Sequence, residues 1–229
     1  FLTLKTINRR LMGSLLQSLL MKDFACWAKR TYLLPLATGI QASNQMRSKV
    51  DELASFLSAK GAKVVTAAPP LDIDEYFLDY VRCLELMVSQ GMPIEARHAA
   101  AEEMKNTGEP VSDAMAEGML MNAHDYLGLL NRRAYYQSVW HSFFKDHDII
   151  MAPMTLDSAF PHQDGPQAER SLLIDNVEVP YFSNIYYPMF AIFAGLPSTA
   201  FPAGLDSQGL PMGLQAIGSY LEDRTTLRF

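Results

Sequence analysis

The chain has 229 residues, with 19 Lys and Arg against 25 Asp and Glu and a formal net charge of −6. Hydrophobic residues make up 49% and charged residues 19%, which supplies a core and excludes an intrinsically disordered chain. The mild negative charge gives no reason to expect binding to nucleic acid or to an anionic membrane surface, because both require a basic face. We find no repeat and no flexible linker, so we expect one domain.

Two cysteines, Cys26 and Cys83, are too few for a disulfide framework or a four-thiolate zinc site. This usage fits a reducing compartment, so we expect a cytoplasmic protein. The longest charge-free run, residues 179–205, is long enough to cross a bilayer, but four prolines interrupt it. We therefore expect no membrane span, and we interpret this run as buried irregular backbone and strand.

The first predicted helix starts at a cap, Ser43, and ends at Lys60, just before Gly61. Its apolar residues recur at spacings of four, three and four, which places them on one face: Met46, Val50, Leu53 and Leu57. A strand is predicted at residues 62–67, and an earlier short strand at residues 23–28. A helix followed at once by an apolar strand is typical of a sheet covered by helices.

Three more helices are predicted downstream. The first begins at Asp72, where Glu75 three residues later resembles a capping box, and the second runs from Pro93 to Gly108. The third and longest covers residues 122–146, and its apolar material comprises Leu130, Ala134, Trp140, Phe143 and Phe144.

Residues 148–153 form a continuous apolar run of strand length, without the alternation of a half-exposed strand. Central strands that are covered on both faces have this pattern. Further strands are predicted at residues 197–201 and 212–218. The fold class expected from these elements is α/β, with a mixed β-sheet flanked by helices.

Most catalytic motifs are absent from the sequence, including G-x-S-x-G, H-E-x-x-H, C-x-x-C and the P-loop. The histidines lack metal-ligand spacing, so no metal site is expected. Ser142 and Lys145 have the spacing of a serine and its base on one helical turn. Neighbouring carboxylates at Asp146 and Asp148 would keep the lysine charged, and we interpret the pair as a solvated helix end.

Several segments, taken in order, resemble the carboxyl-terminal half of an amidase signature family hydrolase. They include a D-hydrophobic-hydrophobic-x-x-P strand, a following loop with an arginine, two G-L-P segments and a polar turn: Asp148–Pro153, Ala159–His162 with Arg170, Gly195–Gly204, Gly209–Gln215 and Glu222–Arg224. The resemblance covers residues 21–229, which we interpret as a partial amidase-like α/β domain. Residues 1–20 remain an unassigned segment.

The resemblance implies hydrolysis of a linear carboxamide by acyl transfer to serine, without a cofactor. The family's catalytic lysine, its serine in a cis peptide and its nucleophilic serine lie upstream of the matched region. The chain contains no adjacent serine pair and no glycine-rich serine loop. We therefore assign no catalytic residue and expect the chain to be inactive alone. The chain resembles half an enzyme. Three origins stay open: a truncated chain, a broken reading frame or a degenerate relative of the family.

The resemblance also suggests which residues line a substrate pocket for a small amide. Ala152, Met154 and Thr155 lie beside the proline that ends a strand, and Phe190 and Phe193 precede a glycine-proline strand. Core packing is the alternative for all five.

Two polar residues are interpreted as structural. Arg170 is expected to form an ion pair with a loop carboxylate rather than to reach substrate. Gln215 lies inside an apolar strand, so its amide requires hydrogen-bond partners.

Two other functions stay open. A half-sheet leaves strand edges exposed, so the chain is alternatively a non-catalytic binding or assembly module that forms a homo-oligomer. A weaker alternative is membrane association through the N-terminal leucines: Leu11, Leu15, Leu16, Leu19 and Leu20.

Overall fold

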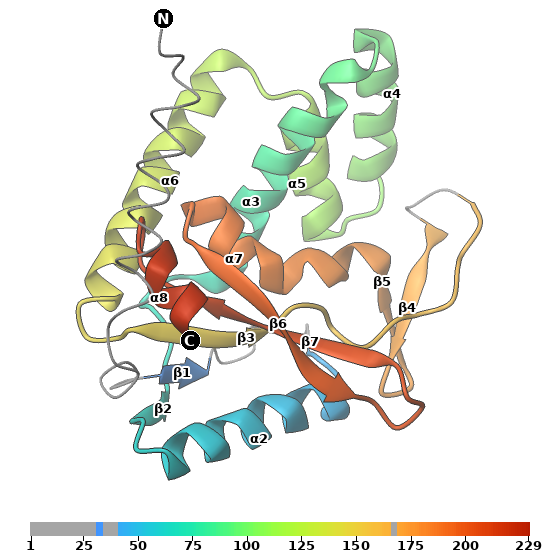
Figure 1. Cartoon of the computed structure of the whole chain (residues 1–229). Helices are drawn as coiled ribbons and strands as arrows, with labels where there is room; N and C mark the ends of the chain where they lie inside the picture. Colours follow the sequence, from blue (N-terminus) through green and yellow to red (C-terminus); the bar gives the residue numbers. More distant parts are fainter. Residues whose placement is uncertain (1–30, 34–40, 166–168) are drawn as a thin grey trace, which may run out of the picture.

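The computed structural model describes residues 31–33, 41–165 and 169–229. Within them, a five-stranded sheet has helices on both faces, with α2 on one side and α7 with the α3–α6 group on the other (Figure 1). In spatial order the strands are β2 (Val64–Thr66), β1 (Thr31–Leu33), β3 (Ile149–Pro153), β7 (Pro211–Ile217) and β6 (Ser198–Leu205). The helices are α2 (Asn44–Ala59), α3 (Ile73–Val88), α4 (Ile94–Lys105), α5 (Pro110–Met119), α6 (Ala123–Phe143), α7 (Tyr186–Ala194) and α8 (Asp223–Arg228).

The sheet is mixed, which confirms the fold class predicted from the sequence. β1 pairs in parallel with both β2 and β3, whereas β7 pairs antiparallel with β3 and β6. All five residues of β3 are buried, so the prediction of a central strand covered on both faces is confirmed. Of the described helices, none combines the length and hydropathy needed to cross a bilayer.

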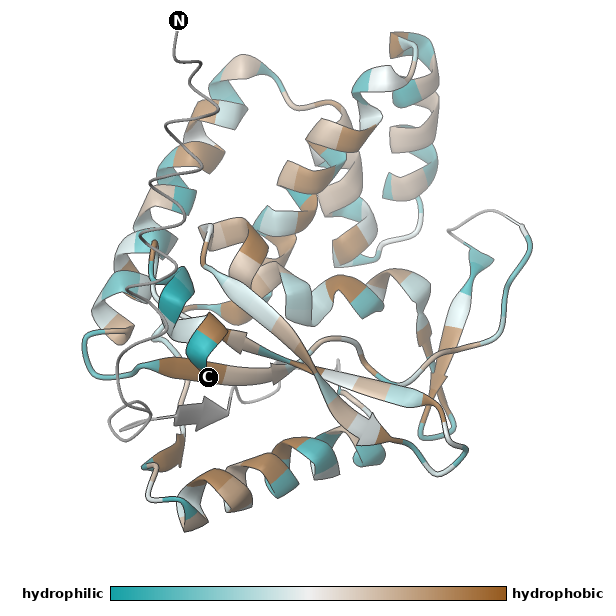
Figure 2. Cartoon of the chain, viewed as in Figure 1, coloured by the Kyte–Doolittle hydropathy of each residue, from teal (hydrophilic) through white to brown (hydrophobic). Residues whose placement is uncertain are grey.

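Local sequence signals account for α2 and β2. The Ser43 hydroxyl accepts a hydrogen bond from the Met46 amide at 3.2 Å, as an N-cap does. Bands of hydrophobic and hydrophilic residues alternate along α2 (Figure 2), and its residues Met46 and Val50 are buried. Gly61 takes a φ of +93° after the helix, and β2 follows as predicted. The strand predicted at residues 23–28 and the N-terminal leucines lie outside the described residues.

The predicted cap of α3 is also confirmed. The Asp72 carboxylate accepts from the Glu75 amide at 3.0 Å at the start of α3. Asn122, the first residue of the predicted long helix, caps α6. Of the apolar residues named for this helix, Trp140 and Phe143 are buried, whereas Ala134 is exposed. The buried residues are spaced seven, four and three apart and form the stripe that faces the core: Leu129, Tyr136, Trp140 and Phe143.

The interpretation of residues 179–205 as irregular backbone and strand was wrong for α7. Its proline, Pro188, lies in the first helical turn, where the missing amide hydrogen costs no intrahelical bond. The helix ends at Gly195, which takes a left-handed conformation with φ of +72°. Pro180 ends β5 and Pro197 comes directly before β6, whereas Pro188 lies in the first turn of α7 and Pro202 lies within β6, an outer strand.

Several elements were not predicted, namely β1, α5, the hairpin of β4 (Ser171–Ile174) and β5 (Val177–Pro180), and α8, where the sequence indicated a polar turn. α5 begins with Pro110 at its first position and is short. The hairpin of β4 and β5 turns at Asp175 and Asn176, whose φ values are both positive. This conformation is that of a tight two-residue hairpin turn, for which the commonest sequence signal is Asn-Gly or Asp-Gly.

Candidate functional site

The three residues predicted beside the strand-ending proline lie at the carboxyl end of β3. Ala152 is buried and pairs in register with Gln215 of β7. The Met154 amide donates to the Gly213 carbonyl at 3.2 Å, which continues the pairing past the strand. The Thr155 hydroxyl donates to the Asp157 carbonyl at 2.6 Å. Met154 and Thr155 are half-buried, so only these two of the three are partly open to solvent.

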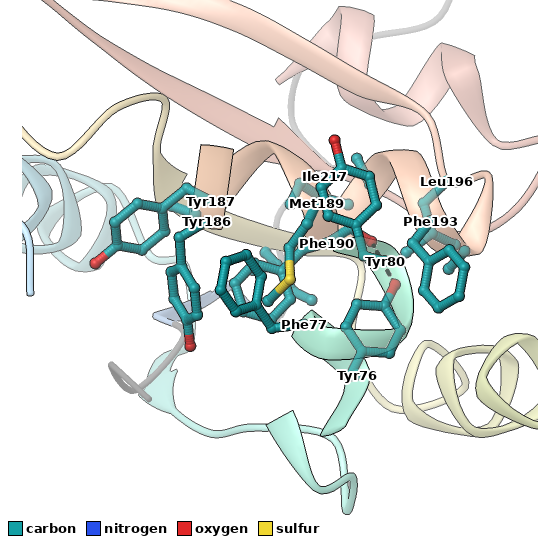
Figure 3. Close-up of a cluster of buried hydrophobic side chains, with 14 of the residues drawn as sticks. Tyr76, Phe77, Tyr80, Tyr186, Tyr187, Met189, Phe190, Phe193, Leu196 and Ile217 are labelled. Carbon is teal, nitrogen blue, oxygen red and sulfur yellow. Dashed lines mark hydrogen bonds between the residues drawn. The ribbon is translucent and has the colours of Figure 1, made fainter. Parts of the chain in front are cut away.

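The two predicted aromatic residues of α7 lie in a closed aromatic core (Figure 3). The Phe190 ring stacks on Tyr76 with centroids 6.2 Å apart, and the Phe193 ring meets Tyr76 edge-on at 5.3 Å. Tyr76 also donates its hydroxyl to the Phe190 carbonyl at 3.2 Å. Phe190 and Phe193 are 1% and 3% exposed, so a small molecule reaches them only if the surrounding core opens. A role toward substrate stays a prediction for all five residues.

The C-terminal end of α7 is held by two side chains of α6. Arg133 Nε donates to the Phe193 carbonyl at 2.7 Å, and Gln137 Nε2 donates to the Ala194 carbonyl at 3.0 Å. These carbonyls have no intrahelical partner at a helix end. The contacts fix the position of α7, and with it the two aromatic residues, against the helical layer.

Gln215 is the buried polar residue of the sheet, and it is 1% exposed. Its amide nitrogen donates to the Pro153 carbonyl at 2.9 Å and to the Tyr187 carbonyl at 3.2 Å. Its amide oxygen accepts from the Ser198 hydroxyl at 2.8 Å. The prediction of a structural hydrogen-bonding role is confirmed, since Gln215 joins β3, β6 and α7 at one point.

Replacing Gln215 with leucine is expected to lower the free energy of unfolding by about 2 kcal/mol. The change leaves the Pro153 and Tyr187 carbonyls without this buried donor. Urea unfolding checks the value, with Gln208→Leu on the exposed β6–β7 turn as the matched control. Equal stability of Gln215→Leu and Gln208→Leu would show that the three hydrogen bonds contribute nothing net.

Beyond the carboxyl end of β3 lies a cavity of about 790 Å³. It is an open cavity lined mainly by the loop 157–163, the β4–β5 hairpin and the turn 206–210 between β6 and β7. None of the five predicted residues lines it. The lining loop starts at Asp157, two residues after Thr155, and Phe190 and Phe193 are buried in the aromatic core. Sequence reasoning missed this cavity, since its walls come from segments far apart in the chain.

The first turn of α2 ties all three walls together. The Ser43 hydroxyl donates to Asp157 at 2.8 Å, and the Asn44 amide donates to Asp175 of the hairpin at 2.9 Å. Gln45 Oε1 accepts from the Ser207 amide of the β6–β7 turn at 2.8 Å. Carboxylates are favoured near helix N-termini, where amide hydrogens point outward. The cavity walls are therefore fixed to one rigid element.

Other residues considered from the sequence lie away from this cavity. Ser142 and Lys145 are both exposed at the end of α6, as expected for a solvated helix end. Arg170 was expected to form an ion pair with a loop carboxylate, and this prediction was wrong. Its guanidinium donates to the Gly165 carbonyl at 2.8 Å and lies over the Tyr181 ring. In the described ranges, no three His, Cys, Asp or Glu side chains are placed to hold a metal ion.

The mixed sheet has helices on both of its faces, which defines an α/β protein. Its strands β3, β6 and β7 overlap the segments with amidase strand motifs: Asp148–Pro153, Gly195–Gly204 and Gly209–Gln215. The Amidase family model matches residues 34–227. The chain belongs to this family.

Solved structures with the same fold include an amidase (19% identity, TM-score 0.60) and a bacterial aryl acylamidase of the amidase signature family (18%, 0.58). A 6-aminohexanoate cyclic dimer hydrolase is also similar (15%, 0.59). The first two matches cover 88% of this chain but only 44% and 42% of those proteins, and the third covers 92% of this chain and 46% of that protein. The chain thus spans less than half their length. No curated protein matches it.

Proposed function

We propose that this chain supplies the carboxyl-terminal part of an amide hydrolase and does not hydrolyse amides by itself. In the whole protein, a serine would attack a linear carboxamide, release the amine and pass the acyl group to water. The observation that carries the proposal is the combination of a family match over most of the chain with coverage of less than half of the similar proteins. The absence of an adjacent serine pair from the sequence supports it.

Within this proposal, residues 21–229 form the amidase-like part, and five side chains face or support the substrate pocket of the whole enzyme. They are Ala152, Met154, Thr155, Phe190 and Phe193. Their position at the end of β3 and on α7 supports the assignment, because α/β proteins bind ligands beyond the carboxyl ends of their strands. We further propose a cytoplasmic location, which the free thiol of Cys83 supports.

The proposal predicts that the purified chain releases no amine from a panel of linear carboxamides above the buffer rate. The reason is that a nucleophile requires a base within hydrogen-bond reach. The sequence has no adjacent serine pair, and Ser142 and Lys145 lie exposed at a solvated helix end. Amine release measured over hours with fluorescamine checks this. Turnover that disappears when one of the chain's own serines becomes alanine would contradict the proposal, whereas turnover that survives every serine change reveals a contaminant.

A second candidate function is a non-catalytic assembly module. β6 is the outermost strand on its side of the described sheet, and Ser198, Ala200 and Pro202 along it are exposed. Ile192 of α7 is also 58% exposed. Outer strands with free backbone groups pair with other chains unless they are protected. Light scattering decides this point: a dimer or larger species supports assembly, and a monomer across a hundredfold range of concentration, about 1–100 µM, argues against it.

A further inference from the structure

The cavity beyond β3 has the size and rigidity of a small-molecule site. Its volume of about 790 Å³ falls inside the range of about 300–1,000 Å³ that is typical of such sites. The hairpin and the β6–β7 turn that line it lie at the same end of the sheet (Figure 1). Ser43 and Asn44 donate hydrogen bonds to two of its walls and Gln45 accepts one from the third, so the cavity exists before any ligand arrives.

Part of the lining is apolar. Leu172 and Ile174 of β4 are buried beneath it, at 4% and 7% exposure. Phe160, Leu173 and Leu210 line it and are exposed to solvent. The Phe160 ring is held in place by an edge-on contact with Tyr181, with centroids 5.6 Å apart. An apolar group of a ligand that binds against these exposed side chains would remove their apolar surface from water.

The charged part of the lining has one sign. Asp157, Glu178 and Asp206 come from three different segments, and among the described residues that line the cavity none is Lys, Arg or His. Hydrogen bonds from the Ser158 hydroxyl and from the Leu210 amide hold the pKa of Asp206 below its usual value, so this carboxylate stays ionised near neutral pH. The carboxylates do not converge as ligands of one metal ion.

Two arginines of the neighbouring segments bind other groups. Arg47 lies 3.9 Å from Asp175 and donates to Gln41 and Asn44. Arg170 donates to the Gly165 carbonyl. Three partly engaged carboxylates without a cation in the lining give the cavity a negative potential, which attracts cations and repels carboxylate ligands.

We propose that this cavity binds an organic cation, namely a small molecule that carries an ammonium group on an apolar chain or ring. The apolar group lies against Phe160 and Leu172, and the ammonium group is held by Asp157 and Glu178. This inference goes beyond the proposed function, because binding here requires no serine nucleophile and no other part of the amidase fold.

The test uses three probes that share a phenylbutyl group and differ in the charge of the terminal group: 4-phenylbutylammonium, 4-phenylbutanol and 5-phenylpentanoate. Calorimetric titration into the full chain is expected to show saturable binding of the cation, about tenfold weaker binding of the alcohol and no binding of the carboxylate. Glu178→Gln is expected to weaken cation binding about fivefold. Glu178 is exposed, so its replacement leaves the fold intact, and Glu102→Gln on α4 is the matched control outside the cavity.

A second variant, Leu210→Arg, brings a cation to the rim of the cavity and is expected to abolish binding of the ammonium probe. Unchanged thermal unfolding establishes that both variants are folded. Equal affinity for the three probes would overturn the proposal, and so would cation binding that survives Glu178→Gln and Leu210→Arg unchanged. These outcomes are independent of amide hydrolysis, so they leave the proposed function untouched.

Discussion

Replacing Ile150 with aspartate is expected to leave the protein insoluble or molten, because the new carboxylate has no partner in the centre of the sheet. Ile150 is 0% exposed and lies in β3, between β1 on one side and β7 on the other. Burying an unpaired carboxylate costs several kcal/mol, a large share of the ~5–15 kcal/mol that stabilises a domain. Near-UV circular dichroism and thermal unfolding measure the loss of packing.

The matched control for this change is Val177→Asp on β5. Val177 is 62% exposed, so the same carboxylate remains in water there and the free energy of unfolding is expected to change by less than about 0.5 kcal/mol. A soluble Ile150→Asp protein with the wild-type melting temperature would show that β3 is an exposed edge. The architecture described above would then be wrong.

Replacing Asp79 with asparagine is expected to lower the free energy of unfolding by about 3 kcal/mol. Asp79 of α3 is 0% exposed. Its Oδ1 accepts from Arg132 and Arg82 at 2.7 and 2.8 Å, and its Oδ2 accepts from Arg132 and the Tyr136 hydroxyl at 2.7 and 2.8 Å. Removing this charge leaves two guanidinium groups without their shared buried partner. Urea unfolding checks the value.

Glu75→Gln is the control, since Glu75 also accepts from Arg82 but its side chain is 47% exposed. Exposed ion pairs contribute little, so this change is expected to cost less than about 1 kcal/mol. Equal losses for Asp79→Asn and Glu75→Gln would contradict the central role of Asp79 between α3 and α6.

The carboxylate of Asp79 also makes the stability of the protein depend on pH. Burial disfavours the ionised form, but hydrogen bonds from Arg132, Tyr136 and Arg82 outweigh burial and hold the pKa of Asp79 below its ordinary value. The stabilisation is therefore present above the unfolded-state pKa of about 4 and is lost as pH falls through the lower folded-state pKa. The gap in melting temperature between wild type and Asp79→Asn is expected to narrow between pH 7 and pH 3.

Sequence patterns predicted the elements that depend on local signals. The caps at Ser43 and Asp72 and the apolar run of β3 each lie within a few residues, and each predicted its element correctly. Gln215 was interpreted correctly because a buried amide must find partners wherever it lies. α7 was missed, since Pro188 is normally a sign against a helix and is tolerated only in the first turn.

Features built from distant residues left no such pattern. Asp79 meets Arg132 across 53 positions, and nothing in the sequence around either residue indicates the pair. The cavity walls are joined by the first turn of α2, whose Ser43 binds Asp157 across 114 positions of the chain. Periodicity reports which face of one element is buried, and it carries no information about which elements lie side by side.

We propose that this chain has the amidase fold without a catalytic serine of its own. The test is labelling with a fluorophosphonate that reacts with activated serines, followed by intact mass spectrometry. We expect the folded chain to stay unlabelled while an active serine amidase in the same tube is labelled fully. Stoichiometric labelling of one serine in the folded chain, lost on heat unfolding and on changing that serine to alanine, would contradict it.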